Sequence, residues 1–330
     1  MDHRPRLGDV AARVGVSTAS VSLVLRGAPG PSAETRRRVL EAAADLGYRA
    51  DRSASMLARR RRHLLGVLLD IRNPFHAELV EEVQVAADGV GYEVVLSTVT
   101  RLRAEERAVE TLLDFRCEAV LLLGPDLADE RLSVLAGQVP MVAIGRRVAA
   151  PVDVVRSADH LGVAEALSHL IDLGHRRIAF LDGGRGAVAS ARRRGYRDAM
   201  RQAGLRDDIR IISGDHTEEG GIRAGRLLAA DSDPPTAVVA SNDRCAVGLM
   251  DALVRCGWVL PEAMSIIGYD DSSLARLAHI DLTTVNQDAP AQAKFAVSAA
   301  VERLDEGRTE RVEVVLNPHL VIRGSTAPPP

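Results

Sequence analysis

From residue 64 onward the chain alternates short, unbroken apolar runs with segments of helical periodicity. The runs lie at Leu64–Ile71, Tyr92–Val99, Ala119–Gly124, Pro140–Gly145, Arg177–Leu181, Thr236–Ser241 and Met264–Tyr269. Strands that are apolar on both faces are typical of a parallel sheet that helices cover on both sides. Seven such strands between residues 64 and 269 are many for one sheet, so the pattern predicts an α/β body with two parallel sheets.

The first 63 residues differ from this body in pattern and in charge. They hold 13 arginines against 6 acidic residues, a net charge of +7, whereas the remainder holds 29 basic and 39 acidic residues, a net charge of −10. Apolar periodicity predicts three helices in this head, at residues 7–14, 18–25 and 33–46. The expected apolar face of the third helix consists of Val39, Leu40, Ala43 and Leu46. A basic head on an acidic body indicates that only the head meets a polyanion.

The first two of these helices have the features of a helix-turn-helix. Such a motif needs a small residue where the helices cross, a glycine at the turn and an apolar anchor on the second helix. Ala11, Gly15 and Val21 meet these needs, and Ser17 is expected to cap the second helix. The outward face of that helix would then carry Thr18, Ala19, Ser20, Ser22 and Leu23. An ordinary three-helix bundle without a partner is the alternative, and the charge favours DNA binding.

A polar, arginine-rich stretch joins the head to the body and ends in the run Arg59–Arg62. It is too short and too polar to be a stable helix by itself. One interpretation is a solvated linker. The other is a segment that becomes helical only on DNA, with Leu57 as an apolar wedge between base steps in the minor groove.

Composition and motifs exclude several other classes of protein. The three cysteines, Cys117, Cys245 and Cys256, lack metal-site spacing, and we expect buried, reduced thiols and a cytoplasmic location. No signal peptide and no apolar run of membrane-spanning length is present in this sequence, so we expect no membrane partner and no exported solute-binding protein. The sequence also lacks the hydrolase elbow, the phosphate-binding loop and the zinc-helix motif. We therefore expect no enzyme, no cofactor and no metal.

Polar residues follow several of the predicted strands, where ligands bind in open α/β folds. Asp70 follows the first strand, Asn242 follows a later one, and Asp270 follows another. A polar residue at a strand end can equally cap the next helix, and both interpretations remain open for each of them.

Short motifs spread over the whole chain resemble the LacI/GalR (lactose-repressor-type) family of bacterial transcriptional regulators. In the head they are Asp9-Val-Ala, Gly15-Val-Ser-Thr-Ala-Ser-Val-Ser, Ser32-x-x-Thr35-Arg, Leu46-Gly-Tyr48 and Leu57-Ala58. In the body they include Asn73-Pro-Phe, Leu173-Gly-His-Arg-Arg-Ile-Ala, Gly195-Tyr196, Ser241-Asn-Asp243, Ser265-Ile-Ile-Gly-Tyr-Asp-Asp271 and Leu320-Val-Ile-Arg-Gly-Ser-Thr. Each motif is short, but their number and order make the resemblance specific.

The resemblance implies a fold and a set of domain boundaries. An all-α helix-turn-helix head would occupy residues 1–50 and a hinge helix or linker residues 51–63. An effector-binding and dimerisation domain like a type I periplasmic binding protein would occupy residues 64–330. Its N-lobe would comprise about 64–158 and 288–318, and its C-lobe about 159–287 and 319–330.

The resemblance also implies functional residues. The DNA-contacting positions correspond here to Ser17, Thr18, Ala19, Ser20, Ser22, Leu23, Arg52, Ala54 and Leu57. The effector-contacting positions correspond to Asp70, Asn73, Phe75, Arg192, His216, Asn242 and Asp270. Two positions depart from common members: Leu23 replaces a frequent arginine, so no arginine–guanine contact is available there, and Arg6 replaces a capping Thr or Ser.

The implied function is sequence-specific regulation of transcription. We expect a homodimeric repressor that binds palindromic double-stranded operator DNA, with affinity controlled by a small effector between the lobes. A sugar or sugar derivative is the expected effector, because a forked arginine with Asp and Asn acceptors suits vicinal hydroxyls. The alternative is a cytosolic carbohydrate-binding protein or enzyme without operator-specific regulation. The effector acts as an inducer or as a corepressor, and the sequence favours neither.

Overall fold

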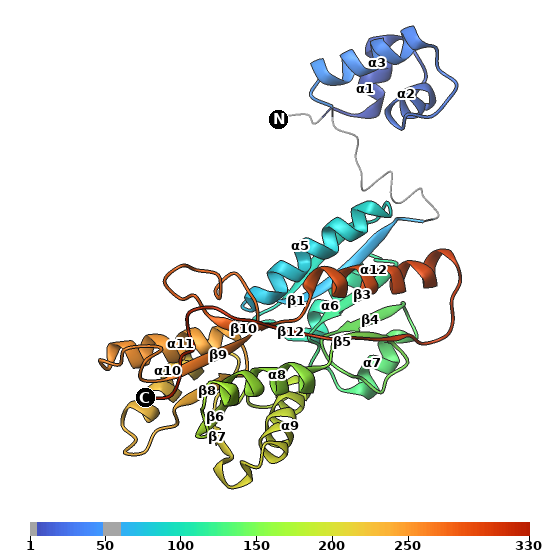
Figure 1. The fold of residues 1–330 in the computed structure, drawn as a ribbon. Helices are drawn as coiled ribbons and strands as arrows, with labels where there is room; N and C mark the ends of the chain where they lie inside the picture. The colour runs from blue at the N-terminus through green and yellow to red at the C-terminus, as the bar shows by residue number, and fades with distance from the viewer. Residues whose placement is uncertain (1–4, 49–60) are drawn as a thin grey trace. The chain divides into compact units, whose positions relative to one another are not determined.

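The computed structural model describes residues 5–48 and 61–330. The chain divides after Arg62 into two compact units, each described by itself (Figure 1). The predicted DNA contacts Arg52, Ala54 and Leu57 lie outside the described residues.

The first unit contains the three predicted helices, α1 (Leu7–Val14), α2 (Thr18–Leu25) and α3 (Ala33–Asp45). The axes of α1 and α2 meet at 106°, within the range of a helix-turn-helix. Gly15 adopts a left-handed conformation with φ +74° at the turn, which glycine accepts without a Cβ clash. Ser17 caps α2, because its hydroxyl accepts from the backbone N–H of Ser20 at 3.1 Å.

The core of this unit is aliphatic and differs in one residue from the prediction. Val10, Val21 and Val39 are fully buried, but Leu40 is 50% exposed. Ala42 is buried in its place, because positions i, i+3, i+4 and i+7 share one helix face and Leu40 lies beside that stripe.

The second unit contains two lobes, each built on a six-stranded sheet. The first sheet has the order β11-β5-β4-β3-β1-β2, and its paired strands are all parallel. Its strands are β1 (Leu64–Asp70), β2 (Glu93–Val99), β3 (Ala119–Leu123), β4 (Met141–Ile144), β5 (Asp153–Ser157) and β11 (Glu313–Leu316). The second sheet has the order β12-β10-β9-β8-β6-β7, with only the β10–β12 pair antiparallel. Its strands are β6 (Ile178–Leu181), β7 (Arg210–Ile212), β8 (Ala237–Ala240), β9 (Ser265–Asp270), β10 (Thr283–Asn286) and β12 (His319–Val321).

Helices cover the sheets of both lobes. The helices of the first lobe are α5 (Pro74–Gly89), α6 (Glu105–Asp114), α7 (Asp129–Ala136) and α12 (Ala289–Asp305). Those of the second lobe are α8 (Asp159–Asp172), α9 (Ala187–Gln202), α10 (Glu218–Ala229) and α11 (Asp243–Arg255), with a short 3-10 turn η1 at Arg206–Asp208. Helices α8 and α9 pack on one face of the second sheet, and α10 and α11 pack on the other (Figure 1). The chain passes between the lobes three times: between β5 and α8, between β10 and α12, and between β11 and β12.

The apolar runs predicted seven of the twelve strands, and the prediction of two mainly parallel sheets is confirmed. Pattern reasoning missed β5, β7, β10, β11 and β12. These strands are three to five residues long and carry polar or half-exposed residues, so no apolar run marks them.

The three cysteines differ in their exposure to solvent. Cys117 and Cys245 are buried free thiols, but Cys256 is exposed, so the expectation of three buried thiols is wrong for it. It follows the last turn of α11, where the chain leaves the packed face.

In residues 5–48 and 61–330 no single helix has the length and apolarity to cross a membrane, although the bent pair of α1 and α2 passes that test jointly.

Glycine allows α10 and α11 to pack at very short range, which yields a first prediction. A Cβ on Gly221 would lie 2.1 Å from the carbonyl oxygen of Cys245. We expect Gly221→Ala to lower the free energy of unfolding by about 1–3 kcal/mol, because the helices must separate. Gly89→Ala in α5 is the matched control, since nothing lies within 4 Å of that added Cβ. Urea titration of both variants tests this, and equal stabilities would contradict it.

Candidate functional site

A cavity of about 340 Å³ lies between the two lobes. Residues that follow the carboxyl ends of strands in both sheets line it, as expected for an open α/β fold. The structure brings together all of the predicted effector-contacting residues in its wall, namely Asp70, Asn73, Phe75, Arg192, His216, Asn242 and Asp270.

Arg192, on α9, is the most constrained of these side chains. Only 4% of it is exposed. Its Nε donates to Asp159 Oδ1 at 2.9 Å and its Nη1 donates to the carbonyl oxygen of Ser241 at 2.5 Å. The guanidinium carbon lies 3.6 Å from the ring centroid of Tyr269, a cation–π contact. Burial opposes its charge, yet Asp159, Tyr269 and Asp270 together raise the pKa of Arg192, so the guanidinium is charged.

Asp270 is a second carboxyl group near the same guanidinium, with Oδ1 3.5 Å from Arg192 Nη1. The same oxygen accepts from Gln287 Nε2 at 2.7 Å. Burial and the nearby carboxylate of Asp243 raise the pKa of Asp270 to about 8, although Arg192 lowers it. Burial is the largest cause, and Arg192 offsets it only in part because this guanidinium lies closer to Asp159. The backbone of Asp270 is left-handed, with φ +117°, which is a strained conformation for a side-chain-bearing residue.

Three of the predicted residues also hold the structure itself together. Asn73 caps α5 by accepting from the N–H of Phe75 at 3.1 Å, and Asn242 caps α11 by accepting from the N–H of Cys245 at 2.9 Å. Asp70 accepts from the guanidinium of Arg72 at 2.8 and 3.0 Å. Asn242 therefore does cap a helix, as one of the two interpretations proposed, and it does so through its side-chain oxygen. Its side-chain nitrogen donates to the carbonyl oxygen of His216 at 3.3 Å.

The two remaining predicted residues supply apolar and neutral surface. Phe75 is buried in the core of the first lobe and forms part of the cavity wall. Burial and the charge of Arg192 lower the pKa of His216 to about 4, so this imidazole is neutral at pH 7. A Cβ on Gly183 would lie 2.2 Å from the ring of His216, so only glycine fits beside it.

Several wall residues were not found by sequence reasoning. His76 is buried, its Nδ1 accepts from the N–H of Asp70 at 3.1 Å, and burial lowers its pKa to about 4, so the neutral ring carries its proton on Nε2. Gln287 reaches the cavity from the second crossover, and Gln292 reaches it from α12. A polar residue directly after Phe75 was the available sequence clue for His76, whereas Gln287 follows a strand that no apolar run marks.

The predicted DNA-contacting face of the head has few free polar groups. Thr18 and Ala19 are exposed, whereas Ser20, Ser22 and Leu23 are half-buried. The hydroxyls of Ser17 and Ser20 lie 3.0 Å apart and bond to each other. Where Arg6 replaces the usual capping residue, Asp9 completes the helix start by accepting from the N–H of Arg6 at 2.7 Å. The surface can approach a phosphate backbone closely because its outward residues are small.

Within the described parts of the chain no group of three His, Cys, Asp or Glu side chains could hold a metal ion. The cavity wall combines one buried guanidinium with carboxylate, amide and neutral imidazole groups. Such a set binds a small polar molecule through oriented hydrogen bonds.

Comparison with known proteins identifies both units. The sequence model of the bacterial regulatory proteins of the lacI family matches residues 6–51, and that of the periplasmic binding protein-like domain matches residues 167–326. The HTH-type transcriptional regulator CelR of Thermobifida fusca is 34% identical in an alignment that covers 98% of this chain and 98% of that protein.

Solved structures agree with this match over the body and over the whole chain. A LacI transcriptional regulator from a Rhodococcus species shares 43% identity with a TM-score of 0.78, covering 80% of this chain and 98% of that one. The complex of the transcriptional regulator CelR with cellobiose shares 32% identity with a TM-score of 0.71, covering 98% and 100%. The lac repressor dimer bound to operator and the anti-inducer ONPF shares 27% identity with a TM-score of 0.84, covering 98% and 100%.

The helix-turn-helix, the two lobes and these similarities along nearly the whole chain are features of a non-enzymatic class of DNA-binding regulators. The chain therefore belongs to the LacI family of bacterial transcriptional regulators.

Proposed function

We propose that this protein is a cytoplasmic repressor whose affinity for a palindromic operator is controlled by a sugar or sugar derivative bound between its lobes. The observation that carries the proposal is the cavity with the buried Arg192 guanidinium between Asp159 and Asp270. A fixed fork of donors beside carboxylate and amide acceptors suits vicinal hydroxyls. The similarity to a regulator solved with cellobiose supports the same ligand class.

In this proposal the head at residues 1–50 reads DNA and residues 51–63 form the hinge. Residues 64–330 bind effector and dimerise, with the lobes divided at about 158, 287 and 318. The reading face consists of Ser17, Thr18, Ala19, Ser20, Ser22 and Leu23, and the hinge contacts are Arg52, Ala54 and Leu57. The proposed effector contacts are Asp70, Asn73, Phe75, Arg192, His216, Asn242 and Asp270.

We propose a homodimer because the first lobe has an exposed apolar edge. Strand β2 lies at the end of its sheet, and Ile71, Leu96 and Leu102 around it are 62%, 51% and 100% exposed. Exposed apolar residues around a strand with one unpaired edge are typical of a surface that another chain covers. The lac repressor is a dimer in its structure with operator. A change in the angle between the lobes on effector binding would alter the spacing of the two hinges and so the operator affinity.

The DNA-binding part of this proposal is tested with a selected DNA sequence. A palindrome selected from random DNA should bind at least about 1,000-fold tighter than random DNA in a gel-shift assay. Leu57→Ala should remove most of this preference and leave weak, salt-sensitive binding, because the wedge is lost while phosphate contacts remain. Equal affinity of the unchanged protein for selected and random DNA would contradict the proposal.

The effector is then sought in a thermal-unfolding screen of D-glucose, D-ribose, cellobiose and their phosphates. A ligand present at 100 times its Kd adds about 2.7 kcal/mol to the free energy of unfolding. The same compound should change operator affinity in the gel shift. A screen in which no carbohydrate stabilises the protein but another class of metabolite does so would overturn the sugar assignment.

A further inference from the structure

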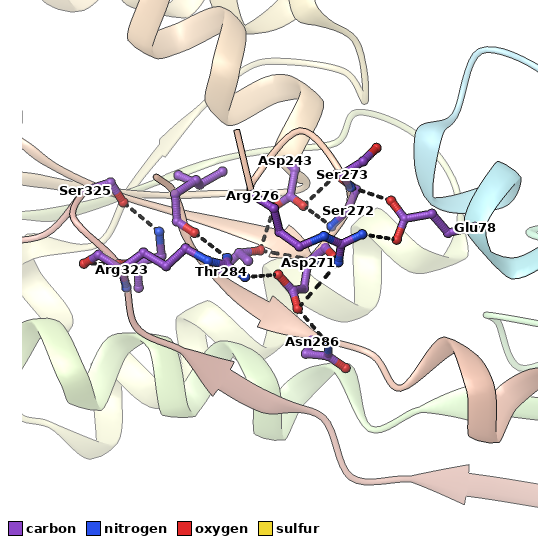
Figure 2. Close-up of polar contacts among 12 residues, drawn as sticks. Glu78, Asp243, Asp271, Ser272, Ser273, Arg276, Thr284, Asn286, Arg323 and Ser325 are labelled. Atoms are coloured by element: carbon purple, nitrogen blue, oxygen red, sulfur yellow. Dashed lines mark hydrogen bonds and ion pairs between the residues drawn. The ribbon is translucent and has the colours of Figure 1, made fainter. Parts of the chain in front are cut away.

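Glu78 is the single side chain of the first lobe in a polar network that otherwise belongs to the second lobe (Figure 2). It projects from α5, the helix that Asn73 caps at the wall of the cavity. Its Oε2 accepts from Arg276 Nη2 at 2.7 Å, and its Oε1 accepts from the backbone N–H of Ser273. One carboxylate of the first lobe thus holds two donors of the second lobe.

The segment that Glu78 contacts, residues 271–276, is held to the second lobe by several hydrogen bonds. The buried carboxylate of Asp243 accepts from the N–H and the hydroxyl of Ser272 at 2.7 and 2.8 Å. Asp271 accepts from Arg323 Nη2 at 2.6 Å and from Asn286 Nδ2 at 2.8 Å. Figure 2 shows Arg276 between this anchored segment and Glu78. Because the segment is bound at several points, the position of Arg276 is fixed relative to the second lobe.

The same segment begins at the cavity. Asp270 lines the cavity and lies near Arg192, and the next residue, Asp271, starts the anchored segment. Both residues have positive φ, +117° and +52°, so the backbone here is held in a conformation that few side-chain-bearing residues adopt. Arg276 also donates from Nη1 to the carbonyl oxygen of Asp271 at 2.7 Å. The guanidinium that contacts Glu78 is therefore hydrogen-bonded to the residue next to Asp270, a proposed effector contact.

We infer that Glu78 is a positioning residue that holds the lobes in the closed arrangement by clasping Ser273 and Arg276. The clasp, defined as these three residues, couples the closed state to the placement of Asp270. This inference rests on the proposed function for its biological meaning, but its physical content, a bias toward closure, does not require the effector or the operator. A ligand that favours closure then binds more tightly when the clasp is present.

The test measures the distance between the lobes in the full-length protein. A spin label on the exposed Cys256 of the second lobe is paired with one on an introduced cysteine, Asp114→Cys, at the exposed end of α6, while Cys117 and Cys245 are buried. Labelled chains are diluted into unlabelled ones, so that only distances within one chain are recorded by pulsed electron paramagnetic resonance.

Glu78→Lys is the decisive variant, because it replaces the attraction to Arg276 by repulsion and removes the acceptor for the N–H of Ser273. We expect the ratio of closed to open forms to fall by about fivefold or more. Glu81→Lys, the same change at an exposed position of α5, is the matched control and should leave the distances unchanged. Combining Glu78→Lys with Arg276→Glu should restore part of the closed population, which loss of a merely structural residue would not do.

The outcomes separate the inference from the proposed function. An unchanged distance distribution in Glu78→Lys, or an identical shift in Glu81→Lys, would overturn the clasp whatever the effector proves to be. A shift confined to Glu78→Lys and reversed by Arg276→Glu supports the clasp even if no sugar binds. If the charge-reversed chain fails to fold, Glu78→Gln replaces it, since the amide keeps an acceptor for Ser273 and removes only the ion pair.

Discussion

Replacing Arg192 by methionine is expected to lower the free energy of unfolding at pH 9 by about 3–5 kcal/mol, because two buried carboxylates lose their cation. Asp159 and Asp270 are only 8% and 7% exposed, so water cannot replace the guanidinium. The effector response of operator binding should also disappear, since the fork of donors in the cavity is gone. Arg194→Met, an exposed arginine on the same helix, is the control and should have little effect on either quantity.

The loss should depend on pH in a definite direction. Burial raises the pKa of Asp270, and without Arg192 only the hydrogen bond from Gln287 opposes this shift. In the unchanged protein this carboxyl group ionises as pH rises through about 8, so the cost of the missing cation at Asp270 appears over that range. Urea titrations should therefore give a smaller loss at pH 6 than at pH 9. A loss that is the same at both pH values would show that the unpaired carboxylates are not its cause.

Replacing Asp153 by alanine is expected to lower the free energy of unfolding by a similar amount, about 3–5 kcal/mol. This carboxylate is fully buried at the start of β5. It accepts from Arg303 at 2.6 and 2.8 Å, from Arg308 at 2.8 and 3.2 Å, and from the N–H of Val312 at 2.8 Å. It thereby joins β5 to α12 and to the segment before β11. Glu313→Gln is the control, because Glu313 pairs with Arg156 in a partly exposed contact of small value.

The loss at this site also depends on pH, but over a more acidic range. Burial opposes the charge of Asp153, but its hydrogen bonds with Arg303 and Arg308 hold the pKa of this carboxyl below its usual value. Its stabilisation is present above the unfolded pKa of about 3.9 and is lost as pH falls through the folded pKa. The difference in unfolding free energy between the unchanged protein and Asp153→Asn should therefore shrink below about pH 4. A constant difference down to pH 2 would contradict the assignment.

The sequence correctly predicted the features that depend on a few neighbouring residues. The turn at Gly15, the cap at Ser17 and the buried valines of the head follow from helical periodicity and capping chemistry, which act over a few residues. The longer strands β1 and β3 follow from unbroken apolar runs. Leu40 shows the limit of such reasoning, because a shift of one helical position moves a side chain from the core to solvent.

The residues of the cavity wall could not all be predicted from local sequence patterns. His76 and Gln287 lie far apart in the sequence and reach the same wall from different elements, and Gln287 does so only because β10 lies beside β9. The double use of Asn242, as a cap and as a wall residue, likewise depends on where α11 begins relative to the neighbouring loop.

The sequence by itself determined the helical head, the two-lobed α/β class, the family motifs and the residues at the ends of the apolar strands. These depend on periodicity, capping and short motifs, which each segment carries independently of the others. Only the tertiary structure decided that Asp159 pairs with Arg192, that Arg303 and Arg308 share Asp153, and that Glu78 meets Arg276 across the lobes. The physical reason is that strand order, crossovers and lobe closure bring such groups together, and no local pattern encodes which distant charge will become the neighbour of a buried one.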